Sequence, residues 1–240
     1  MPRKPYGLLC PISRASEILA PRWTIQILTE IWAGSTRFND IRRAVGSISP
    51  GVLAGRLREM EASGLIERVE DKAAGTVDYL RTEKGIALEP VLNALATWAQ
   101  QNIEAEVALA NTSISPLMWK LRTVIQVDVL PGKRSVIRFH FNDGEGQFDT
   151  YWLIAQPGGL PELCVYDPGL DVNLFVETTV VALGGIIMGR TTFEREIDRG
   201  SLFLSGDARL VRTIAQWLPV SRHAQTTNVC QLGDGITDAA

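Results

Sequence analysis

The sequence predicts an α+β protein of two domains: a helical domain that carries a β-hairpin, then a domain in which helices cover an antiparallel sheet. Apolar residues recur at helical spacing in the first hundred residues, then alternate at strand spacing, then return to helical spacing near residue 178. The 240 residues suffice for two separate hydrophobic cores. We expect the first domain over residues 1–112, the second over 115–220, and a flexible tail over 221–240.

Three short helices are expected in the first domain, over residues 23–32, 38–45 and 50–63. The third has the clearest start, because Ser49 is a capping residue and Pro50 fits the first helical position, where a missing N–H costs nothing. Its apolar residues Leu53, Leu57 and Met60 share one face, which we expect to be buried.

A β-hairpin is expected directly after these helices. Leu65–Glu70 and Val77–Arg81 are the predicted strands, joined by a turn over residues 71–76. Two helices joined by a glycine-containing turn and followed by a hairpin make a winged helix-turn-helix. Thr82 then favours a new helix, and Pro90 divides it from a long helical stretch.

These motifs stand in the order and spacing of a known family. The segments are Cys10-Pro11-Ile12, Trp23-Thr24, Arg37–Ile41, Ile48-Ser49-Pro50, Asp78-Tyr79 and Thr82–Gly85. Over roughly residues 8–105 the chain resembles the HxlR family of winged-helix regulators. The resemblance implies a bacterial transcription regulator, a homodimer joined through the N-terminal segment and the long helix after Thr82. Because the sequence shows no signal peptide and no apolar run long enough to span a membrane, we expect a cytoplasmic protein that does not bind membranes. The implied partner is double-stranded DNA with a pseudo-palindromic operator.

The predicted DNA contacts lie on the second helix of the motif and on the wing. The helix fits the major groove, where Arg pairs with guanine, and a wing lysine can meet phosphates. The candidates are Arg37, Ser47, Ser49, Gly51, Ala54, Gly55, Arg56, Arg58, Lys72 and Thr76. The alternative for Arg56 and Arg58 is a solvated surface paired to Glu59 or Glu61. Residues 1–85 carry 13 basic and 10 acidic residues, a net of +3, although the whole chain is −3.

Cys10 is a second candidate for regulation. Family resemblance suggests a thiol that senses oxidants or electrophiles, and Pro11 would place it at a helix N-terminus, which favours the thiolate. The alternative is a small buried hydrophobic residue at the dimer interface. The three cysteines are too far apart in the sequence for a disulfide framework or a metal module, and His140 has no catalytic motif near it. We therefore expect neither enzyme activity nor a metal or other cofactor.

The second domain is expected to begin with five strands, over residues 124–130, 135–141, 148–155, 162–166 and 171–177. The first turns between them fall at 131–133 and 142–146. Helices are expected over 178–188, 191–198 and 206–218, with a strand at 201–204. Residues 171–218, with Gly184, Gly185 and Gly189, resemble the C-terminal part of sterol-carrier-protein-like domains.

That second resemblance implies an apolar tunnel between sheet and helices that holds a lipid or other hydrophobic ligand. The candidate lining residues are Trp152, Leu174, Leu183, Ile187, Met188 and Phe193. The alternative is that these residues are packed core. Three functions remain open: a regulator that responds to such a ligand, a regulator switched at Cys10, and a lipid carrier whose winged helix does not bind DNA.

Overall fold

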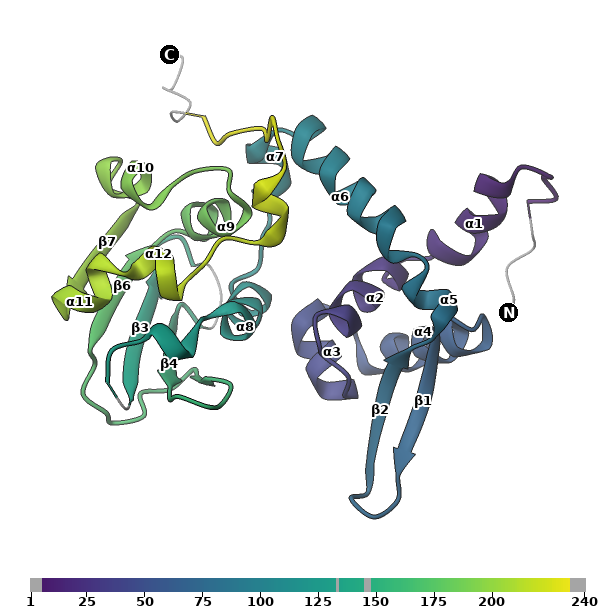
Figure 1. Cartoon of the computed structure of the whole chain (residues 1–240), viewed down its shortest axis with the longest axis horizontal. Helices are drawn as coiled ribbons and strands as arrows, with labels where there is room; N and C mark the ends of the chain where they lie inside the picture. Colours follow the sequence, from purple (N-terminus) through teal and green to yellow (C-terminus); the bar gives the residue numbers. More distant parts are fainter. Residues whose placement is uncertain (1–5, 133, 145–147, 234–240) are drawn as a thin grey trace. The chain divides into compact units, whose positions relative to one another are not determined.

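The computed structural model describes residues 6–132, 134–144 and 148–233, and the chain divides into two units, Met1–Leu92 and Asn93–Ala240 (Figure 1). This boundary lies earlier than the predicted one near residue 112. The reason is that Ala105 and Leu109 are buried in the second unit against Leu232. Helix α6 (Glu89–Asn102) begins in the first unit and ends in the second. Pro90 lies in the first turn of α6, so the proline stands at the start of the long helix, as predicted.

The first unit has the predicted winged helix-turn-helix. Its elements are α1 (Pro11–Leu19), α2 (Thr24–Trp32), α3 (Phe38–Val45), α4 (Pro50–Ala62), β1 (Ile66–Asp71), β2 (Thr76–Arg81) and α5 (Glu83–Ile86). The core combines Ile27 and Leu28 of α2 with Ile41 of α3 and Leu53 and Leu57 of α4, all at most 2% exposed. These are the residues that helical spacing placed on the buried faces.

The β-hairpin is attached to the helices by backbone hydrogen bonds. Tyr79 N–H donates to the carbonyl of Thr36 at 2.8 Å, so the segment before α3 lies beside β2. The Thr82 hydroxyl donates to Gly64 O at 2.6 Å and accepts from the amide of Gly85 at 3.0 Å. The single threonine thus caps α5 and holds it against the start of β1.

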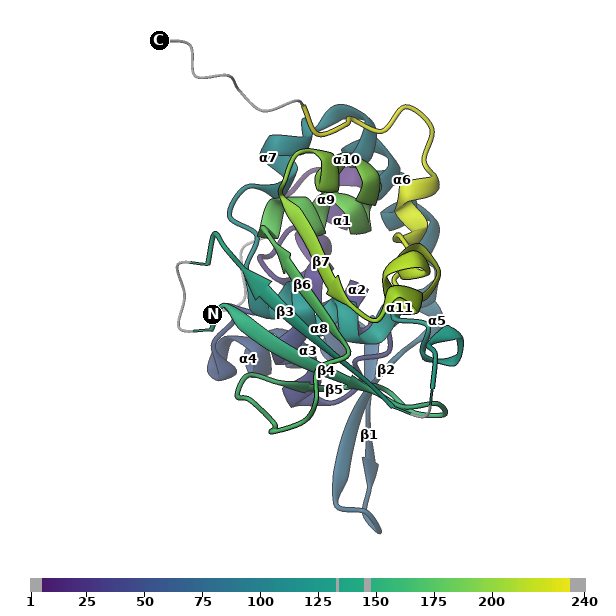
Figure 2. The same ribbon diagram turned by 90° about the vertical axis from the view of Figure 1, so that its left-hand side faces the viewer.

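The second unit is a five-stranded sheet covered on one face by helices. Its elements are α7 (Ala105–Leu109), α8 (Ile114–Val124), β3 (Ser135–Phe141), β4 (Thr150–Ala155), β5 (Glu162–Cys164), β6 (Leu174–Thr178), α9 (Val180–Met188), α10 (Phe193–Asp198), β7 (Leu202–Gly206), α11 (Ala208–Arg212) and α12 (Ile214–Trp217), with 3-10 turns at Val127–Val129 and Arg222–Gln225. The strand order is β5-β4-β3-β6-β7, and only the pairing of β3 with β6 is parallel (Figure 2). The predicted α+β class with a mainly antiparallel sheet is confirmed.

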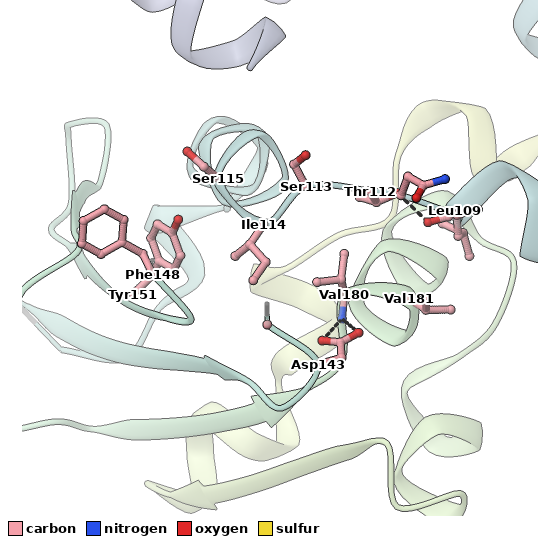
Figure 3. A pocket seen from close by; sticks show the side chains of 13 residues that line it. Leu109, Thr112, Ser113, Ile114, Ser115, Asp143, Phe148, Tyr151, Val180 and Val181 are labelled. Carbon is pink, nitrogen blue, oxygen red and sulfur yellow. Dashed lines mark hydrogen bonds between the residues drawn. The ribbon is translucent and has the colours of Figure 1, made fainter. Parts of the chain in front are cut away.

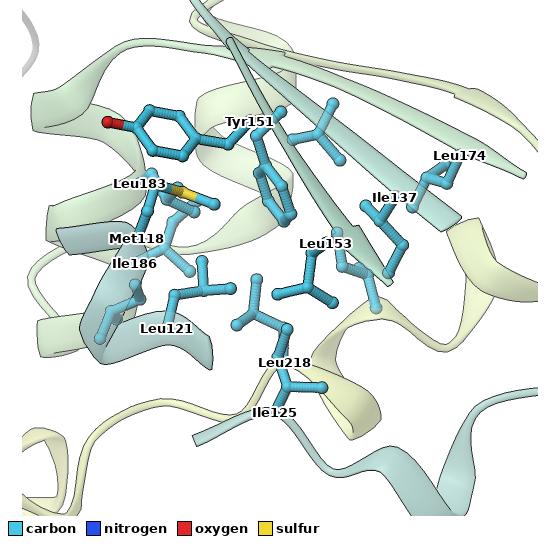
Figure 4. Close-up of a cluster of buried hydrophobic side chains, with 14 of the residues drawn as sticks. Met118, Leu121, Ile125, Ile137, Tyr151, Leu153, Leu174, Leu183, Ile186 and Leu218 are labelled. Carbon is cyan, nitrogen blue, oxygen red and sulfur yellow. The ribbon is translucent and has the colours of Figure 1, made fainter. Parts of the chain in front are cut away.

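The core of this unit lies between the sheet and the helices. Ile137 and Leu153 point from the sheet toward Met118 and Leu121 of α8 and Leu183 of α9 (Figure 4). The opposite face of the sheet is more polar. There Arg138 lies between the rings of Trp152 and Phe175, 5.9 Å from each ring centre.

Two sequence-based expectations for this unit were wrong. Residues 124–130 end α8 and form a 3-10 turn instead of a strand, because Leu117, Met118 and Leu121 give α8 a buried helical face that continues up to Ile125. Ser115, where the second domain was expected to begin, lies inside the same helix, which starts at Ile114. The two predicted turns are described only in part, since Lys133, Glu145 and Gly146 lie outside the described residues.

Residues 221–233, which were expected to begin a flexible tail, pack against the rest of the second unit. Their backbone follows α6 and α9: Cys230 N–H donates to Gln100 O at 2.9 Å, and Leu232 N–H donates to Arg190 O at 2.6 Å. Leu232 is buried. The polar composition of this segment suggested a tail, but its polar groups bind the helices.

Candidate nucleic-acid interface

The start of α4 is fixed by local contacts. Gly46 ends α3 with φ at +84°, a conformation that favours glycine, and Ile48 is buried beside it. Ser49 is the N-cap residue, and its hydroxyl accepts a hydrogen bond from Val52 N–H at 3.3 Å. Ser47 and Ser49 are both exposed. The N-terminus of α4 therefore presents hydroxyl groups and backbone amides to the surface, a combination that suits phosphate oxygens.

The exposed face of α4 carries few side-chain atoms, because two of its residues are glycines. Gly51, Gly55 and Arg58 share this face at spacings of four and three, opposite the buried leucines. A Cβ atom built on either glycine meets nothing within 4 Å. The fold of this unit thus leaves open space at both glycines, and a ligand can approach the helix backbone closely there. Ala54 is half-buried at the edge of the face.

Val52 is a surface residue that the sequence analysis missed. It is 47% exposed in the first turn of α4, next to Gly51. An apolar side chain at the N-terminus of a groove-binding helix can contact a thymine methyl group. Helical spacing gave no signal for it, because Val52 lies about 100° of helix rotation from both Gly51 and Leu53 and so belongs to neither face.

Arg56 and Arg58 behave differently although they are two residues apart. The side chain of Arg56 is only 14% exposed and pairs with Glu59, the alternative weighed for it. Its Nε is buried without a hydrogen bond in the described structure, in a pocket of about 140 Å³ that Thr24 also lines. Arg58 is exposed. Of the two arginines, Arg58 is therefore the one positioned for an external partner.

The wing adds a second exposed segment. The Asp71 carboxylate accepts hydrogen bonds from the amides of Ala73 and Ala74 at 2.9 and 3.0 Å, which closes the turn, and Lys72 stands exposed in it. Thr76 begins β2 and is half-buried. Arg37 is exposed before α3, with its Nε 3.9 Å from the Asp78 carboxylate.

Comparison with known proteins decides the family. Residues 18–107 match the HxlR-like helix-turn-helix family. YvaP of Bacillus subtilis, an uncharacterized HTH-type transcriptional regulator, is 36% identical over 98 residues, which are 40% of this chain and 91% of that protein. This chain belongs to the HxlR family. The N-terminal part of this HxlR protein is therefore a DNA-binding module of a transcriptional regulator, as the motifs predicted.

The structure of a second relative has been solved. The transcriptional regulator YodB of Bacillus subtilis is 36% identical to the HxlR chain over 98 residues, 40% of this chain and 88% of YodB. The structure of its reduced form shares 34% identity, covers 40% of this chain and 97% of that one, and has a TM-score of 0.37.

Cys10 of this chain is exposed at the N-cap position of α1. The backbone amides of Ser13 and Ile12, at the start of the helix, lower the pKa of the thiol because they favour the thiolate. Arg14, which the sequence placed nearby, pairs instead with Glu17 at 3.4 Å. An exposed thiol with a lowered pKa is the chemical requirement for a reactive cysteine.

The predicted ligand residues of the second unit lie mostly in its core. Leu174, Leu183 and Ile187 are at most 2% exposed and belong, with Phe193, to the cluster of Figure 4. Trp152 is on the other face of the sheet, beside Arg138. Met188 differs, because it lines a cavity of about 410 Å³ formed by residues of α6, α7, α8 and α9.

Another cavity, of about 480 Å³, lies where the loop before α8 faces the start of α9 (Figure 3). Asp143 closes one side: both carboxylate oxygens accept from Val180 N–H at 3.0 Å. Tyr151 lines the other side, and burial raises the pKa of its hydroxyl. The Asp143 carboxylate is thus engaged by the start of α9.

Proposed function

We propose that this protein is a dimeric, sequence-specific transcription regulator whose affinity for DNA responds to a small apolar molecule bound in the second unit. The observation that carries the DNA-binding part is the exposed face of α4. It combines a capped N-terminus, two glycines with open space around them, and the unburied Arg58.

This face fits the major groove of B-DNA. The groove admits one helix, whose N-terminal residues reach the base edges. Gly51 and Gly55 let the helix backbone approach, Arg58 supplies a guanidinium for a base edge or a phosphate, and Ser47 and Ser49 supply hydroxyls for phosphates. Lys72 on the wing is the further phosphate contact. Arg56 acts indirectly, since its pairing with Glu59 supports α4 from the side.

Two helices support the proposal of a homodimer. α1 contains no buried residue, and its exposed side chains include Ile12, with Leu9 just before the helix. On α6, Leu95 and Trp98 are about half exposed, at a spacing of three. Apolar side chains of this size on two helices are typical of a surface that a partner covers. A two-fold dimer would read half-sites about 34 Å apart.

The apolar ligand is proposed for the second unit, in line with the resemblance of residues 171–218 to sterol-carrier-like domains. Because Leu174, Leu183 and Ile187 are packed core, the site we propose is the cavity that Met188 lines. For such a ligand to regulate DNA binding, it must bind one state of the protein more tightly than another, typically by about 1–3 kcal/mol.

A second candidate function is a switch at Cys10, favoured by its exposure and its lowered pKa. YodB, the relative described above, has also been solved with quinone bound and after diamide treatment. In this alternative the second unit stabilises the dimer, and an electrophile or oxidant reacts with the Cys10 thiolate.

The DNA-binding proposal is tested by selecting duplexes from a random pool and titrating the best one at several salt concentrations. Log affinity should fall linearly with log salt, because neutralised phosphates release counterions. Arg58→Gln should weaken binding by about 1–3 kcal/mol. Arg212→Gln removes the same charge from an exposed site on α11 and is the matched control. Selection of no duplex, or equal effects of the two substitutions, would contradict the proposed surface and leave the lipid-carrier alternative.

A further inference from the structure

The cavity beside Met188 has walls from four helices, α6, α7, α8 and α9. Its volume is about 410 Å³, within the range of about 300–1,000 Å³ for small-molecule sites. All of its lining residues belong to residues 93–240. The apolar side chains that line it include Ile103 directly after α6, Leu109 of α7, Leu117 of α8 and Met188 of α9. The cavity can therefore hold an apolar body of small-molecule size.

One wall of this cavity carries a buried cation. Arg190 is 2% exposed, and its guanidinium donates to the carbonyls of Ile103, Cys230 and Ala99 at 2.9, 3.0 and 3.3 Å. All three partners are neutral, and two of them are at the C-terminal end of α6, where the helix dipole favours positive charge. Because carbonyls carry no net charge, the positive charge of Arg190 remains available to an anion.

Glu106, an acidic residue that interacts electrostatically with Arg190, is engaged elsewhere. Glu106 is exposed, and its carboxylate accepts from Gly233 N–H at 2.8 Å. That amide is the main reason why the pKa of Glu106 is lowered, with Arg190 and Arg199 contributing less. Glu106 does not line the cavity as described. The charge of Arg190 is therefore only partly balanced from a distance.

The other polar groups of the wall are neutral. Gln100 is buried and donates through Nε2 to Met188 O at 2.8 Å and to His223 O at 3.3 Å. Burial, with smaller effects from Arg222 and Lys120, lowers the pKa of His223, so its imidazole is neutral at pH 7. A wall with one buried cation, neutral hydrogen-bonding groups and aliphatic side chains complements an amphipathic anion.

We propose that this cavity binds a small molecule with an aliphatic body and a single carboxylate, which lies beside Arg190. The inference rests on the proposed function, because it names the chemical class of the ligand that the proposed function requires. It also identifies the element that senses occupancy. Ala96 and Ala99 of α6 line the cavity, as does Ile103 directly after the helix. Leu92 of the same helix is buried in the core of the winged-helix unit. The bound molecule thus touches the helix that enters the DNA-binding unit.

The test uses calorimetric titration of the full chain with octanoate and, separately, with 1-octanol, which has the same chain length but no charge. Octanoate should bind at least about tenfold more tightly, the factor that about 1.4 kcal/mol represents. Ala108→Trp fills the cavity from its exposed rim and should weaken octanoate binding at least about tenfold. Val107→Trp places the same ring on the neighbouring exposed position of α7, outside the cavity, and should leave binding unchanged.

Three results would overturn the inference: no binding of octanoate, equal binding of octanoate and octanol, or octanoate binding that survives Ala108→Trp. Arg190 itself is left unchanged in this test, because its removal would take a buried donor from three carbonyls and could unfold the unit. Titration of the same preparation with the selected duplex distinguishes failure of the ligand class from failure of the proposed function. Protein that binds the selected DNA but no octanoate overturns the ligand class alone, whereas protein that binds octanoate but selects no DNA overturns the proposed function.

Discussion

Substitution of Gly85 by alanine tests the junction between the wing and α5. A Cβ at this position would lie 2.2 Å from the carbonyl oxygen of Leu65 and 3.3 Å from its carbonyl carbon. Both atoms are backbone, so no side chain can rotate away. The same residue donates its N–H to the Thr82 hydroxyl at 3.0 Å, which in turn donates to Gly64 O. Relief of the clash must therefore move α5 away from β1.

The expected loss is the sum of two costs. Forcing an extra methyl group into a packed site costs about 1–3 kcal/mol. Weakening the Thr82 cap adds about 1 kcal/mol. Gly85→Ala should thus lower the free energy of unfolding by about 2–4 kcal/mol, a large part of the roughly 5–15 kcal/mol that stabilises a typical domain.

Urea unfolding and hydrogen exchange measure this effect. In Gly85→Ala the first unit should unfold at lower urea, and the amide of Tyr79, which joins β2 to Thr36, should exchange faster. Gly55→Ala is the control, since nothing lies within 4 Å of its Cβ. If Gly85→Ala changes the free energy of unfolding by less than about 0.5 kcal/mol, the close approach of α5 to Leu65 is not what requires glycine.

Three further predictions concern function. Gly55→Ala should raise helix stability by about 0.5–1 kcal/mol yet weaken binding to the selected duplex, and a variant that gains in both respects would place this face away from DNA. Trp98→Asp puts a charge on the exposed side of α6 and should shift the protein toward monomer in sedimentation, while Val129→Asp, on an exposed 3-10 turn, should not. The lowered pKa of Cys10 means that its thiolate fraction, and hence its alkylation by iodoacetamide, should rise at a lower pH than for an ordinary thiol. Cys10→Ser should abolish this alkylation at lower pH. If the alkylation persists in Cys10→Ser, the reactive thiol is Cys164 or Cys230.

The first unit was predictable because its signals are local. Ser49-Pro50 and the Thr82 to Gly85 segment each specify a cap within four residues, and the structure has both. The strand predicted over residues 124–130 was wrong because the same apolar residues fit a strand and a helix end. Contacts from distant parts of the chain, such as Gln126 N–H with Trp217 O at 2.8 Å, stabilise the observed conformation and leave no local signal.

The sites were predictable only in part. Arg56 and Arg58 are equivalent in composition, but about 200° of helix rotation separates their directions, and one of them meets Glu59. Leu174 and Leu183 were chosen as ligand residues because they are apolar, and apolar spacing indicates burial without distinguishing core from cavity wall. The wall around Arg190 combines residues from α6 to His223 and has no local motif.

The segment after Ser221 has a consequence for the order in which the protein forms during synthesis. Gln100 and Gln101 on α6 contact His223, Thr227 and Cys230 across sequence separations of 123 to 129 residues. The winged helix needs nothing from that distance for its own core and can fold while the rest of the chain is still being translated. The contacts of the second unit are complete only when residues 223–230 have emerged. A chain truncated at Ser221 would retain the winged-helix unit and lose the segment that contacts Gln100, Gln101 and Arg190.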